Sequence, residues 1–392
     1  MKIGITCYPT YGGSGAIATE LGMELSKRGH EVHFITYAHP FRLPHFMEGV
    51  FFHEVEMMRY PLFDHSQYPL TLAAMMHEVT LREGLNVLHV HYAIPHATSA
   101  WIAKEMLGAQ SDLKIITTLH GTDITLVGQD RSFEEITRFS IARSDGLTAV
   151  SEYLRDETVS HFGVERDRIE VIPNFVDARI YDRSLYPCHK KFLVAPGEKL
   201  LMHISNFRQV KRVRDVVRIF DRIQREIPSK LVFVGDGPDR PFAADEAASL
   251  GLSEKVVFLG KQDSVAELLA CADLFLLPSE SESFGLSALE AMSSGVPVVA
   301  SRVGGVVEVV EDGVSGVLEE IGDIDAMARA GLRILGDPQR WLTMSEGARL
   351  SAERFRVDRV VPMYERYYEQ IVTGQTGTGS VESPPPVTPA GP

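Results

Sequence analysis

Short apolar runs rich in β-branched residues alternate with longer stretches of helical periodicity along most of the chain. In the first half these runs occupy residues 3–6, 32–35, 87–91, 115–118 and 147–150, and in the second half residues 200–204, 231–234, 256–259, 274–277 and 296–299. Such alternation is typical of parallel strands connected by crossover helices. The pattern therefore predicts an α/β protein with two Rossmann-like, doubly wound domains that face each other across a cleft.

A change of composition divides the chain between the two alternating regions. Residues 173–198 are rich in Pro, Tyr and charge, and predict a hinge between an N-terminal domain at 1–172 and a C-terminal domain at 199–356. Aromatic and acidic residues at helical spacing in 357–372 predict a helix that packs back toward the N-terminal domain. Residues 373–392 are mainly Gly, Ser, Thr and Pro, so we expect a disordered tail.

The composition is that of a globular protein. Hydrophobic residues make up 44% and charged residues 23% of the 392 residues, enough for more than one core. No apolar run approaches the roughly eighteen residues of a membrane span, and a strand pattern begins at once, so we expect a cytoplasmic protein without stable membrane insertion. Cys7, Cys188 and Cys271 are too few and too widely spaced for a disulfide framework or a closed zinc site. The formal net charge of -14 disfavours nucleic-acid partners, so any phosphate site must be a local basic patch.

A glycine-rich turn follows the first apolar run. Gly12, Gly13, Ser14 and Gly15 separate the predicted strand from a helical pattern that starts at Ala16. Backbone N–H groups at such a turn can approach an anion at a helix N-terminus. An anion or sugar site is one interpretation, and a tight turn with Ser14 as helix N-cap is the other.

Cations follow the first strand of the second half. Asn206, Arg208 and Lys211 come directly after the run at 200–204, where they are well placed for a diphosphate. The alternative is a basic start to a solvated helix, although cations there oppose the helix dipole. Gly235 and Asp236 end the next strand, where the backbone can approach a base or ribose, but a plain turn would look the same.

Two glutamates flank a third candidate loop. Glu282 and Glu290 are separated by Ser283, Phe284, Gly285 and Leu286 and by the start of a predicted helix, which puts Glu282 in the loop and Glu290 two helical turns further on. The loop N–H groups could meet a phosphate while the carboxylates accept sugar and ribose hydroxyls. Alternatively, Glu282 is a dipole partner and Glu290 lies on a solvated face.

Together these segments resemble the retaining glycosyltransferases of family 4, which have the two-domain GT-B architecture, over residues 1–372. The resemblance implies that the C-terminal domain binds a nucleotide sugar, with Arg208 and Lys211 on its diphosphate, Glu282 on the transferred sugar and Glu290 on the ribose. The wider donor set that it implies is Gly13, Asn206, Gly235, Asp236, Ser283, Phe284, Gly285 and Leu286. It places His120, at the end of an N-terminal strand, near the acceptor and the anomeric carbon.

Three segments resemble a narrower group in that family. Residues 3–9, 91–96 and 119–125 are similar to the malate-using members, which serve bacillithiol synthesis. This likeness implies UDP-N-acetylglucosamine (UDP-GlcNAc) and L-malate as small-molecule substrates, retention of the α configuration, and no cofactor. It assigns the acceptor to the N-terminal domain, and leaves a homodimer open.

A dianionic acceptor needs hydroxyls, N–H groups and a cation. Ser14, Tyr92 and Thr118 would supply hydroxyls at the carboxyl ends of strands. For the second carboxylate the sequence offers Arg138 or Arg143; the resemblance favours Arg138, and a surface ion pair is the alternative.

We expect no obligatory metal. Asp323 and Asp325 form the only Asp-x-Asp spacing noted, and we interpret Asp323 as a helix N-cap. His89, His91 and His96 are interpreted as core histidines rather than ligands. Two rival functions are a transferase with a lipid or polysaccharide acceptor, and a nicotinamide- or nucleotide-binding protein on the same fold.

Overall fold

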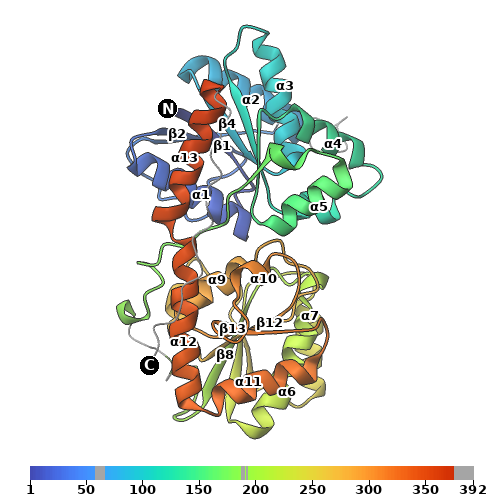
Figure 1. The fold of residues 1–392 in the computed structure, drawn as a ribbon, viewed down its shortest axis with the longest axis vertical. Coiled ribbons are helices and arrows are strands. Elements are labelled where there is room, and N and C mark those ends of the chain that lie inside the picture. Colours follow the sequence, from blue (N-terminus) through green and yellow to red (C-terminus); the bar gives the residue numbers. More distant parts are fainter. Residues whose placement is uncertain (58–66, 187–189, 191–192, 375–392) are drawn as a thin grey trace.

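The structure is a computed structural model that describes residues 1–57, 67–186, 190 and 193–374. In these residues the N-terminal half forms a parallel sheet with the order β3-β2-β1-β4-β5-β6-β7, and the C-terminal half a parallel sheet with the order β10-β9-β8-β11-β12-β13 (Figure 1). Each order reverses direction once, between β1 and β4 and between β8 and β11. In open α/β sheets ligands bind at such switch points, beyond the carboxyl ends of the strands.

The first sheet carries helices on both faces. Its strands are β1 (Lys2–Thr6), β2 (Glu31–Thr36), β3 (Val50–Glu54), β4 (Val87–His91), β5 (Lys114–Leu119), β6 (Gly146–Ala149) and β7 (Ile169–Val171). Its helices are α1 (Gly13–Lys27), α2 (Tyr68–Glu83), α3 (Thr98–Leu107), α4 (Glu134–Arg143) and α5 (Glu152–Phe162), with short π-helical turns at Ala93–Ala97 and Thr122–Leu126.

The second sheet repeats this architecture. Its strands are β8 (Lys199–Ile204), β9 (Ser229–Val234), β10 (Val256–Phe258), β11 (Leu274–Leu277), β12 (Val298–Ser301) and β13 (Gly316–Glu319). The helices of this half are α6 (Val213–Glu226), α7 (Arg240–Ser249), α8 (Ala266–Leu269), α9 (Leu286–Ser293), α10 (Val306–Val309), α11 (Ile324–Leu335) and α12 (Pro338–Ala352). The prediction of an α/β fold with two doubly wound sheets is confirmed.

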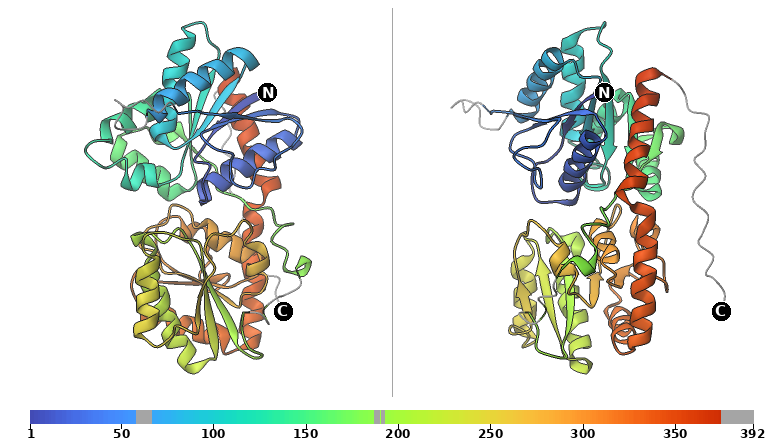
Figure 2. Two further views of the ribbon diagram at one scale, coloured as in Figure 1. Left: turned by 180° about the vertical axis from the view of Figure 1, so that it is seen from behind. Right: turned by 90° about the vertical axis from the view of Figure 1, so that its left-hand side faces the viewer.

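The last helix returns to the N-terminal half. Helix α13 (Val357–Thr373) follows α12, and the two run one after the other along one side of both halves (Figure 2). Tyr364 and Tyr368 of α13 are fully buried and share a core cluster with Ile3 and Ile5 of β1. The chain thus crosses between the halves a second time, which ties them together on the side of α13.

The predicted hinge contributes to the C-terminal core. Tyr181 and Val194 are buried in the same cluster as Phe275 of β11, and Val176 pairs with Arg356 just before α13. Of the predicted hinge, residues 187–189 and 191–192 lie outside the described residues. The same holds for 375–392 of the predicted tail, whereas Thr373 ends α13.

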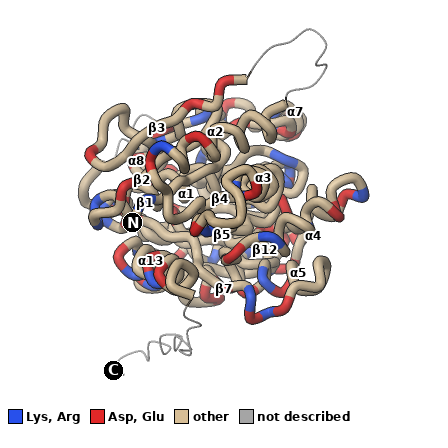
Figure 3. Tube along the Cα trace, turned by 90° about the horizontal axis from the view of Figure 1, so that it is seen from above, with Lys and Arg blue, Asp and Glu red and all other residues tan. Residues whose placement is uncertain are grey.

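Two surface properties bear on the choice of partners. Within the described ranges, every helix is too short or too polar to cross a bilayer. Basic and acidic positions are interspersed over the face seen in Figure 3 rather than separated into two regions.

Candidate active site

The glycine-rich turn after β1 forms one wall of the N-terminal switch point. Helix α1 begins at Gly13, and its N-cap Gly12 gives no side-chain cap, so the interpretation of Ser14 as N-cap is wrong. Instead Ser14 Oγ lies 2.8 Å from the Tyr92 hydroxyl at the end of β4. A Cβ at Gly15 would lie 2.4 Å from the Tyr8 carbonyl oxygen, so only glycine fits there. The turn therefore presents hydroxyls and free helix N–H groups together.

Arg208 follows β8 in the C-terminal half. Arg208 is exposed, and its guanidinium has no hydrogen bond or ion pair within the described part of the chain. Burial raises the pKa of Tyr92, and the positive charge of Arg208 acts against that rise. The charge of Arg208 in the C-terminal half therefore acts on Tyr92 in the N-terminal half. Their motifs predict different substrates for the two groups, but they interact electrostatically.

His120 follows β5 beside the same opening. Its Nε2 lies 2.8 Å from Nδ1 of His91, and burial lowers the pKa of His120 to about 3. Asp123, buried below this turn, accepts hydrogen bonds from the backbone N–H groups of Ala93, His120 and Gly121. The carboxylate therefore fixes the backbone that carries His120.

Thr118 does not point into the opening, and this prediction is corrected. Its hydroxyl is fully buried, 2.7 Å from His89 Nε2 and 2.6 Å from Thr148 Oγ1. Thr118 does lie near the carboxyl end of β5, but helix α13 covers this part of the sheet. Tyr368 of that helix contacts the other ring nitrogen of His89, Nδ1, at 2.7 Å. The hydroxyl thus belongs to a core network.

Both candidate arginines are engaged in contacts with groups other than Ser14 and Tyr92. Arg138 of α4 donates to the Phe162 carbonyl at the end of α5 and pairs with Glu134 at 3.0 Å. Arg143 is exposed and stacks on Phe139. The alternative weighed for Arg138, a surface ion pair, describes its contacts; in addition it satisfies a terminal carbonyl of α5.

The C-terminal half supplies charged groups. Lys211 Nζ lies 2.6 Å from Glu282 Oε1, and Ser279 Oγ donates to the same carboxylate oxygen at 2.9 Å. Glu282 is 9% exposed, so Lys211 is the cation that compensates it. The predicted loops after β8 and β11 therefore meet at the second switch point.

Asn206 and the turn after β9 lie beside these groups. Asn206 is exposed, and a Cβ at Gly235 would lie 1.9 Å from the Ser205 carbonyl oxygen. Gly235 has a φ of 111°, which an L side chain rarely adopts. The Asp236 carboxylate accepts from the N–H of Gly237. This glycine lets the two loops approach each other closely.

Helix α9 begins directly after the predicted glutamate loop. Gly285 is its N-cap with a φ of 93°, and Glu290 is the fifth residue of the helix. Glu290 thus lies about one turn into the helix, where two turns were predicted. Tyr181 donates to its carboxylate at 2.6 Å, and Arg42 Nη2 lies 3.5 Å away. Tyr181 and Arg42 belong to segments without a recognisable motif, so neither was predicted to lie at the site.

The two halves touch at the loops that carry the candidate residues. Ser151 Oγ donates to the Ser283 carbonyl at 2.6 Å, and Gly13 faces the Leu286 side chain. The carboxylate of Glu308 accepts from the N–H groups that open α5, at 2.9 and 3.0 Å. Phe284 is buried behind this contact. The loops that carry Gly13 and Ser283 in the two halves are therefore in direct contact.

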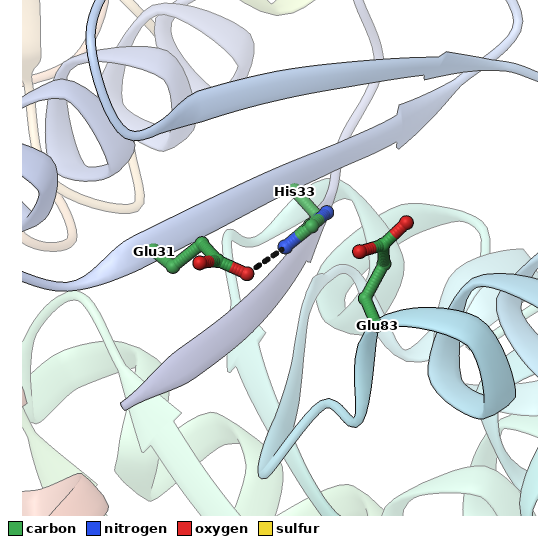
Figure 4. Close-up of side chains that lie close together, drawn as sticks. All are labelled: Glu31, His33 and Glu83. Atoms are coloured by element: carbon green, nitrogen blue, oxygen red, sulfur yellow. Dashed lines mark hydrogen bonds and ion pairs between the residues drawn. The ribbon is translucent and has the colours of Figure 1, made fainter.

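One group of described residues has the spacing of metal ligands but lies elsewhere. Glu31, His33 and Glu83 approach one another where β2 begins and α2 ends (Figure 4). His33 Nε2 lies 3.0 Å from Glu31, and its Nδ1 lies 2.9 Å from His53. Lys2 and Arg82 pair with the two glutamates. All three candidate ligands thus already have partners, at the strand end remote from the opening.

The Asp-x-Asp spacing has a structural role, as predicted. Asp323 is the N-cap of α11, and its side chain accepts from the N–H of Ala326 at 2.8 Å. This pairing satisfies one of the free N–H groups of the helix.

Comparison with known proteins agrees with this geometry. The family described as "Glycosyltransferase Family 4" matches residues 11–179, and "Glycosyl transferases group 1" matches residues 188–351. The chain is 48% identical over 95% of its length to N-acetyl-alpha-D-glucosaminyl L-malate synthase of Bacillus anthracis, of which it covers 97%. It is 29% identical to D-inositol 3-phosphate glycosyltransferase of Nocardia farcinica, over 86% of this chain and 83% of that protein.

Solved structures share the fold. Anabaena HepE, in complex with UDP and glucose, superposes with a TM-score of 0.77 at 20% identity, over 94% of this chain and 99% of that one. A glycosyltransferase from Rickettsia africae has the same TM-score at 18% identity, over 95% and 99% of the two chains. From the family matches and the 48% identity, the chain belongs to the family 4 and group 1 glycosyltransferases, and it is a glycosyltransferase with the GT-B fold.

Proposed function

We propose that this glycosyltransferase transfers N-acetylglucosamine from UDP-GlcNAc to the hydroxyl group of L-malate, with retention of the α configuration. The products would be N-acetylglucosaminyl malate and UDP, in the first step of bacillithiol biosynthesis. The observation that carries the proposal is the 48% identity, over nearly the full length of both chains, to an enzyme named for that product. Two relatives named for inositol phosphate are 29% and 30% identical to this chain.

The donor would bind to the C-terminal wall. A diphosphate carries charge that needs cations, and Arg208 is free to meet it because it has no partner among the described residues. Lys211 would shift from Glu282 toward the phosphates, and Glu282 would then accept a sugar hydroxyl. Asn206, Gly235 and Asp236 flank this position, and Glu290 would take the ribose hydroxyls from its place on α9.

The acceptor would bind to the N-terminal wall. Ser14, Tyr92 and the free N–H groups of α1 suit one carboxylate of malate. We propose Arg208, and no longer Arg138, as the cation that meets this carboxylate. The charge of Arg208 acts on Tyr92, whereas Arg138 is engaged at the end of α5. One guanidinium would then lie between acceptor and donor diphosphate, and bring the two reactants together.

The reaction we propose needs no covalent intermediate. UDP departs from the anomeric carbon, an oxocarbenium-like species forms, and malate attacks on the same face while a donor phosphate oxygen takes its hydroxyl proton. The protein would contribute mainly by stabilising the charge that develops on the leaving diphosphate. We propose that no metal ion is required for this step.

Product analysis with the purified full chain tests the proposal. UDP-GlcNAc is incubated with L-malate, D-malate or D-inositol 3-phosphate, and the product is identified by mass and by the NMR coupling constant of its anomeric proton. We expect an α-linked product with L-malate. A product formed only with inositol phosphate, or a β-linkage, would refute it. Full activity should persist in EDTA, and UDP but not NAD should raise the melting temperature.

A further inference from the structure

A cluster of buried histidines lies behind the N-terminal wall, and only His120 among them has a role so far. His89 and His91 alternate along β4, with ring centroids 4.5 Å apart. Both nitrogens of His89 are paired, with Thr118 and with Tyr368 of α13. His91 differs, since its Nδ1 contacts His120 but its Nε2 is buried without a partner in the described structure.

Both rings of the His91–His120 pair are neutral at physiological pH. Burial lowers the pKa of His120 to about 3 and that of His91 well below its ordinary value. A neutral imidazole carries one N–H and one bare nitrogen. The 2.8 Å contact between His91 Nδ1 and His120 Nε2 therefore needs a hydrogen on only one of these two atoms.

The unpaired nitrogen of His91 distinguishes the two possible arrangements. If His120 donated, the hydrogen of His91 would reside on Nε2, where a buried N–H would have no acceptor. If His91 donates from Nδ1, its Nε2 carries only a lone pair. Buried N–H groups without partners are rarer in proteins than acceptors that are not fully paired. The arrangement with His91 as donor is therefore the favoured one.

We propose that His91 is a positioning residue, whose Nδ1–H bonds His120 Nε2 and thereby holds the hydrogen of His120 on Nδ1. His120 is part exposed, and its Nδ1 has no hydrogen bond to any described residue, so it is open to the crevice. His120 then meets the substrates as a hydrogen-bond donor. It does not take the proton of the acceptor hydroxyl, because the available nitrogen already carries one.

This inference rests on the proposed function only for the identity of the oxygen that His120 meets. A ring N–H suits an oxygen of the transferred sugar or a carboxylate of the acceptor. It also agrees with a step in which the donor phosphate takes the proton, since the closest imidazole is not a base. The assignment of the hydrogen itself depends on the protein alone and can be measured without substrate.

Nitrogen-15 NMR of the histidine rings in the full-length protein tests the assignment directly. The signals of His120 are identified by their loss in His120→Gln. We expect a protonated Nδ1 and a bare Nε2 for His120, where the reverse pattern would overturn the proposal whatever the enzyme catalyses. If the tautomer is as expected but malate is not a substrate, the proposed function fails and this inference stands.

Variants of His91 test its role in positioning. In His91→Leu the donor is lost, so the His120 signals should shift toward the Nε2–H form and kcat should fall about tenfold, the scale for an orienting partner. The KM for UDP-GlcNAc should stay constant. His91→Gln, whose amide can donate, should recover part of kcat. The matched control is His33→Leu, a buried histidine of the same sheet, which should change neither. Unchanged tautomer and kcat in His91→Leu would refute the positioning role, and if that variant does not fold, the wild-type tautomer decides.

Discussion

The two walls of the crevice use different chemistry. On the N-terminal wall the groups are neutral or held neutral by burial: the hydroxyls of Ser14 and Tyr92, and the ring of His120. On the C-terminal wall they are charged, with Arg208 exposed and Lys211 paired with the largely buried carboxylate of Glu282. The same fold, repeated in one chain, thus carries two distinct kinds of site.

This difference shows where a charged group gains more from binding a substrate than it loses by desolvation. A nucleotide diphosphate brings two negative charges, and its negative charge increases when it leaves the sugar. Exposed or ion-paired cations can bind it, because they are not left buried without a partner when it is absent. Near the reacting carbon, a fixed neutral hydrogen bond orients an oxygen without competing for a proton. We therefore expect substitutions on the C-terminal wall to lower turnover most.

The largest effect is predicted for the cations of the C-terminal wall. Arg208→Ala and Lys211→Ala should each lower kcat by hundreds of fold, because loss of one preorganised charged donor costs roughly 3 to 4 kcal/mol of transition-state stabilisation. Steady-state kinetics with UDP-GlcNAc and malate measures this. Arg214→Ala is the control, since Arg214 is exposed on α6 and stacks on Phe242. Near-normal turnover of both site variants would contradict the division between the walls.

The second prediction concerns the contact between the walls. Gly121 has a φ of 115°, and a Cβ there would lie 1.7 Å from Ser283 Oγ in the other half. Gly121→Ala should therefore separate the two walls and lower kcat/KM by tenfold or more, since strain and steric overlap each cost on the order of 1 to 3 kcal/mol. Gly163→Ala also introduces a side chain at a positive φ, 65°, but nothing lies within 4 Å of its Cβ. It should cost stability and leave activity intact, and equal losses in both variants would refute a role for the contact.

The sequence predicted the fold better than the site. Every strand inferred from an apolar run is present, because fully buried parallel strands read as continuous apolar segments. The strands that sequence analysis missed are β3, β7 and β13. Each contains at most two buried residues, so the pattern that marks a strand is weak there.

The positions of candidate site residues were predictable where a motif marked them and not otherwise. Ser14, Arg208 and Glu282 follow strands in recognisable loops, and the two switch points bring such loops together. Tyr181 reaches Glu290 from a segment 109 positions away in sequence, which no local pattern encodes. Thr118 was misplaced because strand ends predict the edge of a sheet, but not which face a later helix covers.

A third prediction follows from the buried histidines. Burial lowers the pKa of His89 to about 3, and of His96 and His203 to about 4, from the ordinary 6.5. The unfolded chain therefore takes up protons below pH 6.5 that the folded chain does not. Stability should be fully present above that pH and fall as the pH drops toward 4, with a slope of up to about 1.4 kcal/mol per unit for each histidine.

Urea unfolding between pH 7 and 5 measures this slope. His203→Gln should flatten it by the share of one histidine, whatever its effect on stability at pH 7. His203 bonds the Leu276 carbonyl and Ser205 at 2.8 Å each, so the variant also loses stability that does not depend on pH. A stability that stays constant over this range would contradict a neutral histidine core.

The smallest effect is predicted where the hinge supports the C-terminal wall. The Tyr181 hydroxyl donates to Glu290 at 2.6 Å, and Arg42 approaches the same carboxylate from the N-terminal half. In Tyr181→Phe the Glu290 carboxylate loses one of the groups that hold it in the orientation proposed for binding the ribose. A hydrogen bond to a charged group is worth about 1.5 to 3 kcal/mol, of which rotation of the side chain and water recover part. We expect the KM for UDP-GlcNAc to rise several-fold with kcat almost unchanged, while Tyr186→Phe, which loses a bond to the Ile180 carbonyl in the same segment, leaves both constant. A fall in kcat at constant KM would instead assign Tyr181 to closure of the two halves.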